Sequence, residues 1–381
     1  MVHFLGVIIS LAVPLNTLVG TVIRHNLAPL LLWSLKQRAD PLSPDLAAQL
    51  APLQTQARQV AARYVLLKTA RAHVGATLAA AGIPALWLKG AALAETVYPQ
   101  PVLRPMGDLD VLVPFERRAE ALAALKAAGY ADEPRDPLAA QVAPFLPPDE
   151  THHHYNLVGG PGGGVRVELH FRVAQTILPD LAALDWFWSQ AVEATDRQGQ
   201  PLGFRTLRPE AHLLYLCAHA LLQHGEANIG LLHLYDLHLL STVHDLDWAL
   251  IVERAVMLRW TYPVERALTL AAEYFGTPIP AWVPEQLRAR RPADEDTTIV
   301  EQIGAGDTRW AQTLRSLRRL TPRQRVALVW RIVFPPRAYL RTRYRVRPGV
   351  PLWLYYPYRW WDQARGVGRG VWRWALLRRR S

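Results

Sequence analysis

The sequence predicts an α+β protein with N-terminal helices, a small mixed β-sheet core and a C-terminal helical domain. Two short strand patterns, at 84–88 and 108–113, are each followed by a helical pattern. Two further strand patterns, at 152–158 and 165–170, flank a glycine-rich turn and predict a β-hairpin. From Pro209 onward the pattern is helical, so a helical bundle is expected to follow the sheet.

Gly and Pro mark where the predicted helices of the first half begin and end. The Ala-rich pattern over 54–81 predicts one long helix, and Gly82 is placed to end it. Residues 1–80 are predicted to be helical throughout. The remaining predictions here are helices at 91–98 and 116–129 and a Pro-rich, acidic surface loop at 131–150.

The second half begins with a clear helix start. Pro209 suits the first turn of a helix, and Glu210 places a negative charge near the positive end of the helix dipole. Helices are predicted at 209–224, 228–242, 247–258 and 261–275. The predicted regions are therefore an N-terminal helical region at 1–80, an α/β core at 81–205, a helical bundle at 206–285, and a linker with a basic, aromatic-rich tail at 286–381.

The composition bounds the class of protein. The chain has 381 residues, of which 50% are apolar and 20% charged, and this excludes a wholly disordered protein. Cys217 is the only cysteine, which excludes an internal disulfide and any cysteine-based zinc or iron–sulfur cluster. The chain fits a reducing compartment, and the expected location is the cytoplasm, although a cysteine-poor secreted protein would have the same composition.

The apolar N-terminus has two interpretations. Residues 4–23 hold no charged side chain and are long enough to span a bilayer. Pro14, Asn16 and Thr21 interrupt the stretch, and no Lys or Arg precedes it. A core helix is therefore favoured over a membrane anchor.

The positive charge is concentrated in the tail. The segment 320–381 holds 15 Arg and a single acid, Asp362, and so carries +14, which leaves −3 on residues 1–319 of a chain whose net charge is +11. Trp and Tyr interleave with these Arg residues. Packing onto the acidic body is favoured first, association with an anionic membrane surface second, and single-stranded nucleic acid is the least favoured partner.

Paired acids in a predicted strand are the central chemical signal. Asp108 and Asp110 are two residues apart, so their side chains point to the same face and repel each other. A divalent cation between them relieves this repulsion, and Mg²⁺ prefers such oxygen ligands. Glu168 lies in another predicted strand, with Arg166 and His170 on the same face, and a third carboxylate from a neighbouring strand would complete a two-metal phosphoryl-transfer site.

A second signal precedes the acids. Gly90 follows Lys89 at the end of the first predicted strand, where glycine permits close backbone approach and the next helix offers free amides to phosphate. Arg104 and Lys89 add positive charge nearby, although Arg104 can instead bond carbonyls of its own Pro-rich loop and Lys89 can be a surface lysine.

These motifs together resemble a family. The resemblance to bacterial nucleotidyltransferases of the DNA polymerase β-like superfamily covers most of residues 25–280. It rests on Leu88-Lys89-Gly90-Ala91-Ala92-Leu93-Ala94, Tyr98-Pro99, Arg104-Pro105-Met106-Gly107-Asp108-Leu109-Asp110-Val111-Leu112-Val113, Val167-Glu168-Leu169-His170, Leu207-Arg208-Pro209-Glu210-Ala211-His212-Leu213-Leu214, Cys217-Ala218-His219-Ala220, Tyr235-Asp236-Leu237 and Asp247-Trp248. Ala91 departs from the family's Gly-Ser and removes a hydroxyl that would contact phosphate.

The resemblance implies a function. Asp108, Asp110 and Glu168 would bind Mg²⁺ or Mn²⁺, and Lys89, Gly90 and Arg104 would lie at the nucleotide phosphates. The implied reaction moves an NMP, with AMP from ATP favoured, to a hydroxyl of a small molecule, peptide or protein and releases pyrophosphate. Asp110 and Glu168 are alternative proton acceptors. The alternatives are a non-catalytic nucleotide-binding or antitoxin-like regulator, and a peripheral membrane accessory factor that acts through its tail.

Histidines offer further candidates. In a strand, His152 and His154 share a face that His153 opposes, which disfavours a three-histidine zinc site unless a loop relaxes the geometry. His212 and His219 fall on one helical face and could line the acceptor side with Asp236, although core histidines bonded to the backbone are favoured.

Overall fold

The computed structural model describes the chain in two compact units, one formed by 1–133 with 153–300 and the other by 134–152 with 301–381. The described residues are 15–37, 44–133, 153–173, 181–224, 226, 229–293, 295, 326, 330, 333–334, 337, 340 and 351–361.

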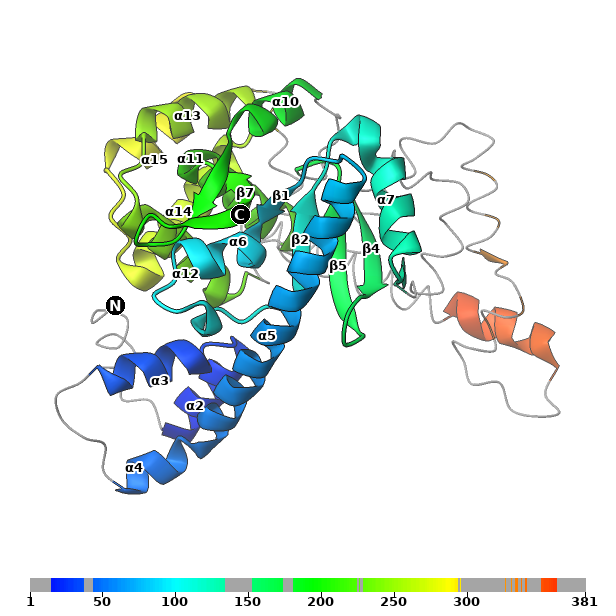
Figure 1. Ribbon diagram of the computed structural model, residues 1–381, viewed down its shortest axis with the longest axis horizontal. Coiled ribbons are helices and arrows are strands. Elements are labelled where there is room, and N and C mark those ends of the chain that lie inside the picture. Colours follow the sequence, from blue (N-terminus) through cyan, green and yellow to red (C-terminus); the bar gives the residue numbers. More distant parts are fainter. Residues whose placement is uncertain are drawn as a thin grey trace. The chain divides into compact units, whose positions relative to one another are not determined.

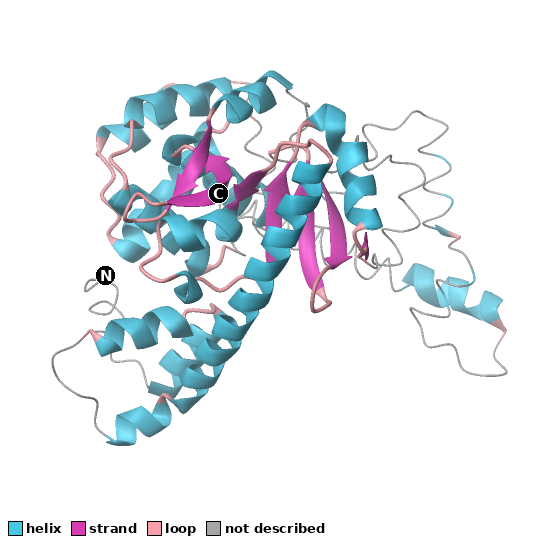
Figure 2. Ribbon diagram, viewed as in Figure 1, coloured by secondary structure: helices cyan, strands magenta, loops and turns pink. Residues whose placement is uncertain are grey.

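A five-stranded sheet forms the centre of the larger unit (Figures 1 and 2). The strand order is β1-β2-β5-β4-β3, with β2 and β5 parallel and every other neighbouring pair antiparallel. This confirms the predicted mixed sheet. The strands are β1 (Leu86–Leu88), β2 (Asp108–Leu112), β3 (Tyr130–Asp132), β4 (His154–Gly159) and β5 (Val165–His170).

Alternation along the strands gives the sheet two different faces. Apolar residues such as Leu109, Val111 and Leu169 are buried on one face against α5 (Ala51–Ala80) and α7 (Arg118–Ala127), and Figure 1 shows both helices beside the sheet. The other face carries the acidic residues of β2 and β5. The sheet therefore has one structural face and one face available for chemistry.

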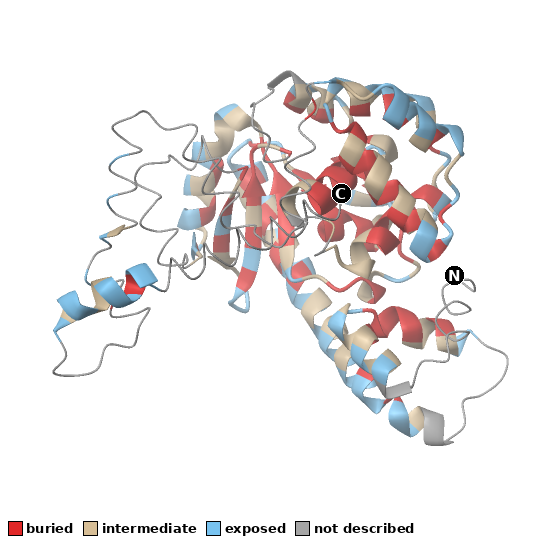
Figure 3. Cartoon of the chain, turned by 180° about the vertical axis from the view of Figure 1, so that it is seen from behind, coloured by how far each residue is buried: buried red, intermediate tan, exposed pale blue. Residues whose placement is uncertain are grey.

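The helical bundle follows the sheet, and its buried core, red in Figure 3, also includes Leu86 and Leu88 of β1. Its helices are α10 (Leu181–Ser189), α11 (Pro209–Ala218), α12 (Leu231–Val243), α13 (Trp248–Met257), α14 (Thr261–Phe275) and α15 (Trp282–Ala289). The single helix expected at 209–224 ends as a π-helical turn, η4 (His219–His224), a feature common at functional sites. Helix α15 extends past residue 285, where the bundle was expected to end.

The N-terminal helices pack on the first half of α5 (Figure 1). They are α2 (Leu15–Arg24), α3 (Ala28–Lys36) and α4 (Pro44–Gln49). Val22 and Leu27 are buried in the same core as the bundle. Among the described residues, no helix combines the length with the apolar character that crossing a membrane requires.

Several elements escaped prediction. The loop expected at 131–150 was wrong at its start, because Tyr130–Asp132 pair with β4; residues 134–150 lie outside the described ones. The hairpin of β6 (Ala191–Thr195) and β7 (Pro201–Leu207) was not predicted either. The Thr206 hydroxyl of β7 donates to the Trp87 carbonyl of β1 at 2.8 Å, which ties this hairpin to the main sheet.

The smaller unit is described only in part. Residues 352–354 form a 3₁₀ turn, η6 (Leu352–Leu354), and 355–361 are helical. Trp330, Trp353 and Trp361 are exposed, and Trp360 donates its indole N–H to the Val333 carbonyl at 2.9 Å. Most of the Arg residues on which the predicted tail interactions depend lie outside the described ones.

Candidate active site

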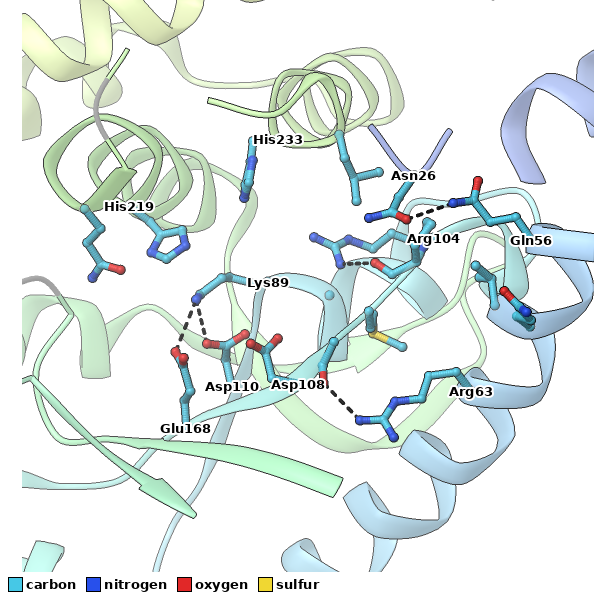
Figure 4. Close-up of a pocket in the computed structure, with 18 of the residues that line it drawn as sticks. Asn26, Gln56, Arg63, Lys89, Arg104, Asp108, Asp110, Glu168, His219 and His233 are labelled. Carbon is cyan, nitrogen blue, oxygen red and sulfur yellow. Dashed lines mark hydrogen bonds and ion pairs between the residues drawn. The ribbon is translucent and has the colours of Figure 1, made fainter. Parts of the chain in front are cut away.

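A pocket of about 520 Å³ opens over the polar face of the sheet (Figure 4). Its lining comes from β2, β5, α5, the 104–107 loop and the first turns of α6 (Lys89–Thr96), together with η4 and α12. The structure places all six residues singled out from the sequence on this lining: Lys89, Gly90, Arg104, Asp108, Asp110 and Glu168.

Strand register brings the acids together. The parallel pairing of β2 with β5 sets Asp110 opposite Glu168, and Asp108 lies two residues earlier on the same face. Ligand atoms of Asp110, Glu168 and His170 lie within 4.8 Å of one another. Glu168 therefore faces the aspartates and does not point to the opposite side of the sheet. Arg166, expected on this face, is exposed and pairs with Glu133 at 2.6 Å.

Lys89 supplies the countercharge to these carboxylates. Its Nζ lies 2.6 Å from Asp110 Oδ1 and 3.6 Å from Glu168 Oε2, as Figure 4 shows. Burial alone would lower the pKa of Lys89, but Asp110 and Glu168 outweigh it and raise the pKa, so the ammonium stays charged.

The backbone at Lys89 is strained. Its φ of 44° lies in the left-handed region, which a non-glycine residue rarely adopts. The buried His212 Nε2 accepts a hydrogen bond from the Lys89 backbone N–H at 3.1 Å. The sharp turn from β1 into α6 is thus held by the bundle, and it aims Lys89 at the acids. His212 is bonded to backbone, as the favoured interpretation of the sequence had it.

His170 links two of the carboxylates. Its buried Nε2 donates toward Asp110 Oδ1 at 3.0 Å and toward Glu168 Oε2 at 3.3 Å. Burial alone would lower the pKa of His170, but these two hydrogen bonds raise it. Burial alone would raise the pKa of Glu168, but the hydrogen bond from His170 and the charge of Lys89 hold it well below its usual range. The sequence had placed His170 on this face without giving it a role.

Asp108 is the carboxylate that Lys89 and His170 neutralise least. Burial, and then the charges of Asp110 and Glu168, raise its pKa to about 6. The excess of negative charge on this face fits a divalent cation, because such an ion would relieve the repulsion that raises this pKa.

Asp108→Asn is therefore expected to stabilise the metal-free protein at neutral pH. The pKa in the folded state, about 6, exceeds the usual aspartate value of 3.8, so ionised Asp108 destabilises the fold. This cost is absent below the lower value, grows between the two values and is complete above the upper one. Urea unfolding in a chelating buffer should show wild type and variant equal near pH 3, and the variant more stable by about 2–3 kcal/mol at pH 7. A difference that does not change with pH would contradict this.

Arg104 is held by the bundle. Its Nε and Nη2 donate to the carboxylate of Asp236 at 3.1 and 2.6 Å, and its Nη1 donates to the Pro105 carbonyl at 3.0 Å. Tyr98 donates its hydroxyl to the same carboxylate at 2.7 Å. Asp236 is fully buried. All three nitrogens of Arg104 thus have protein partners, and the loop at 104–107 is fixed to α12.

Gly90 leaves the space that the Arg104 side chain occupies. A Cβ at Gly90 would overlap Nη1 of Arg104 and would lie 2.7 Å from Cγ of Met106. From the sequence, this glycine was predicted to let the backbone approach a ligand closely. In the structure the group that approaches it is the Arg104 side chain. The glycine is needed because the guanidinium packs directly on the start of α6.

Gly90→Ala is expected to destabilise the protein by about 1–3 kcal/mol through overpacking. Gly75 in α5 provides a matched control, since a Cβ there has no neighbour closer than Trp87 Cζ2 at 3.9 Å. Gly75→Ala should leave stability unchanged or raise it by about 0.5–1 kcal/mol. Thermal unfolding of both variants tests the difference, and equal effects would show that the packing around Gly90 tolerates a methyl group.

One wall of the pocket was not foreseen. Asn26, from the turn between α2 and α3, lines the pocket together with Gln56 and Arg63 of α5 and the acids. Arg63 Nη2 donates to the Gly107 carbonyl at 3.0 Å, next to Asp108. Nothing in the spacing of these residues links them to β2, because helix packing alone brings them there. From the other side, His219 and His233 line the pocket, and for His219 this was the less favoured of the two interpretations of the sequence.

The comparisons agree with this geometry. A family model described as an uncharacterised nucleotidyltransferase matches residues 13–276. The chain belongs to this nucleotidyltransferase family. No match is found among curated proteins or among solved structures. The match spans the N-terminal helices, the sheet and the bundle through α14, and nucleotidyltransferases as a class move an NMP from an NTP. The assignment to the DNA polymerase β-like superfamily stays a prediction.

Proposed function

We propose that this protein is a metal-dependent nucleotidyltransferase that moves an NMP, with AMP favoured, from an NTP to a hydroxyl of a small molecule, peptide or protein. The observation that carries the proposal is the parallel register of β2 and β5, which sets Glu168 beside Asp110 with Asp108 on the same face. In the reaction the hydroxyl oxygen bonds to the α-phosphorus, and the bond from that phosphorus to pyrophosphate breaks.

Asp108, Asp110 and Glu168 would hold Mg²⁺ or Mn²⁺. When bound, the metal would neutralise the triphosphate and lower the pKa of the acceptor hydroxyl. Lys89 lies among the same carboxylates and is charged. Its ammonium group can therefore exchange its contact with Asp110 for one with a phosphate oxygen by a short movement of the side chain. Gly90, in the first turn of α6, lines the pocket and would offer its backbone amide to a phosphate. Arg104 contributes by fixing its loop and by its charge.

The hydroxyl proton goes to a carboxylate. The sequence left Asp110 and Glu168 as alternatives, and His170 bonds both. A proton that reaches either carboxylate thus enters one hydrogen-bonded group, which makes the two acids a joint acceptor.

A second candidate is a nucleotide-binding regulatory protein without transfer activity. The Lys89–Asp110 ion pair favours it, since it neutralises the acids without a metal. This candidate requires that a nucleotide bind while Lys89 stays on Asp110.

One experiment separates the two. The full chain is incubated with each α-labelled NTP, Mg²⁺ or Mn²⁺, and a cell lysate as the source of acceptors. The proposal expects label on an acceptor, with one pyrophosphate released for each label transferred and with ATP as the best donor. Calorimetry that shows nucleotide binding, with no label transferred and no pyrophosphate released in either metal, would favour the regulatory protein.

A further inference from the structure

Three histidines meet beside the carboxylates. His153 directly precedes β4, His154 begins it, and the register of β4 with β5 sets His154 opposite His170. The ring centroids of His153 and His154 are 4.2 Å apart, and both rings lie within 5.4 Å of the His170 ring. Ring nitrogens of the three residues lie within 4.8 Å of one another. Because His153 lies outside the strand, the objection to a shared ion that strand alternation raised does not apply to it.

The hydrogen bonding in this cluster is incomplete. Nε2 of His153 meets both Nδ1 of His154 at 2.8 Å and the Gln223 side-chain amide at 2.7 Å, although a neutral ring nitrogen has one in-plane lone pair. Nδ1 of His153 and Nδ1 of His170 are buried and have no hydrogen-bond partner in the described part of the chain. Such a convergence of nitrogens is satisfied when a cation accepts their lone pairs.

His170 has the arrangement of a metal-ligating histidine. Its Nε2–H is directed at the carboxylates of Asp110 and Glu168, which fixes the ring, and a cation bound at Nδ1 would take the place of any proton carried there. His154 also lines the pocket, which provides a route for an ion.

We propose that His153, His154 and His170 form a second cation site, whose imidazoles select a borderline metal ion such as Zn²⁺ over Mg²⁺. The three nearby carboxylates outnumber the one ammonium of Lys89, so the surroundings favour a divalent cation. The inference does not depend on the proposed function, since metal binding is measured without a nucleotide.

The test is titration of the chelator-treated full chain with Co²⁺ in excess Mg²⁺, followed by visible absorption. The affinity for Zn²⁺ is then measured by competition with Co²⁺ under the same conditions. Wild type is expected to bind Co²⁺ with the absorption of a nitrogen-rich site and to release it to Zn²⁺. His153→Ala and His154→Ala should each weaken binding about 100-fold, at the strong end of the effects known for groups that support a metal. If either alanine variant fails to fold, His154→Gln is measured in its place, because glutamine keeps more of the side-chain volume.

Two controls make the result specific. His238→Ala removes a part-buried histidine of α12 that bonds Thr277, and it should change Co²⁺ affinity by less than about twofold. Asp108→Asn should keep the Co²⁺ absorption, whatever it does to nucleotide transfer. Absence of Co²⁺ and Zn²⁺ binding in excess Mg²⁺, or binding that both His153→Ala and His154→Ala leave unchanged, would overturn the proposal.

Discussion

Asp110→Asn is expected to lower the rate of NMP transfer by at least about 10³-fold, because loss of a metal-binding carboxylate removes several kcal/mol of charge stabilisation. Asp110 is buried, and it accepts contacts from both Lys89 and His170. Asparagine keeps the shape of the side chain but can neither neutralise Lys89 nor bind a cation as strongly. Pyrophosphate release at saturating NTP and Mg²⁺ measures the effect.

An exposed aspartate provides the matched control. Asp132 pairs with Lys126 on the surface at 2.8 Å, and Asp132→Asn should leave the rate unchanged. Thermal unfolding of both variants would confirm that they remain folded. A folded Asp110→Asn protein with wild-type activity would place the reaction elsewhere in the chain.

Asp236→Ala is expected to have the largest effect on stability, a loss of about 3–5 kcal/mol. Asp236 is fully buried and accepts hydrogen bonds from Arg104 and Tyr98. Its removal leaves the buried guanidinium of Arg104 without a countercharge, and that desolvation cost is then uncompensated. Urea unfolding measures the change in the free energy of unfolding.

Two comparisons identify the cause of that loss. Glu120→Ala breaks an exposed pair with Arg117 and should cost less than about 1 kcal/mol. The double variant Arg104→Met with Asp236→Leu removes both charges and should recover much of the loss of Asp236→Ala. If Asp236→Ala costs no more than Glu120→Ala, the buried pair does not hold the sheet to the bundle.

Local pattern was enough to predict much of the fold. The long helix α5, the strands β2 and β5, and helices α13 and α14 follow from periodicity, turn residues and caps, which act within a few residues. Strand β3 has only three residues and carries no such pattern, because its pairing with β4 alone makes it a strand. The β6–β7 hairpin, whose strands have five and seven residues and pair with each other, was also missed.

The candidate site divides in a similar way. Asp108, Asp110 and Glu168 stand out because strand alternation and residue type specify a shared acidic face. The partners of Lys89 and Arg104 could not be deduced. Arg104 pairs with a residue 132 positions away, and Lys89 is aimed by a strained turn that His212 supports from another helix.

The amino-acid order thus specified which side chains carry charge and which way each strand turns them, since these depend on neighbours along the chain. Which opposite charges meet depends on helices and strands that are distant in sequence and are brought together by burial of their apolar faces. The wall formed by Asn26, Gln56 and Arg63, and the meeting of His153 with His170, exist for that reason alone.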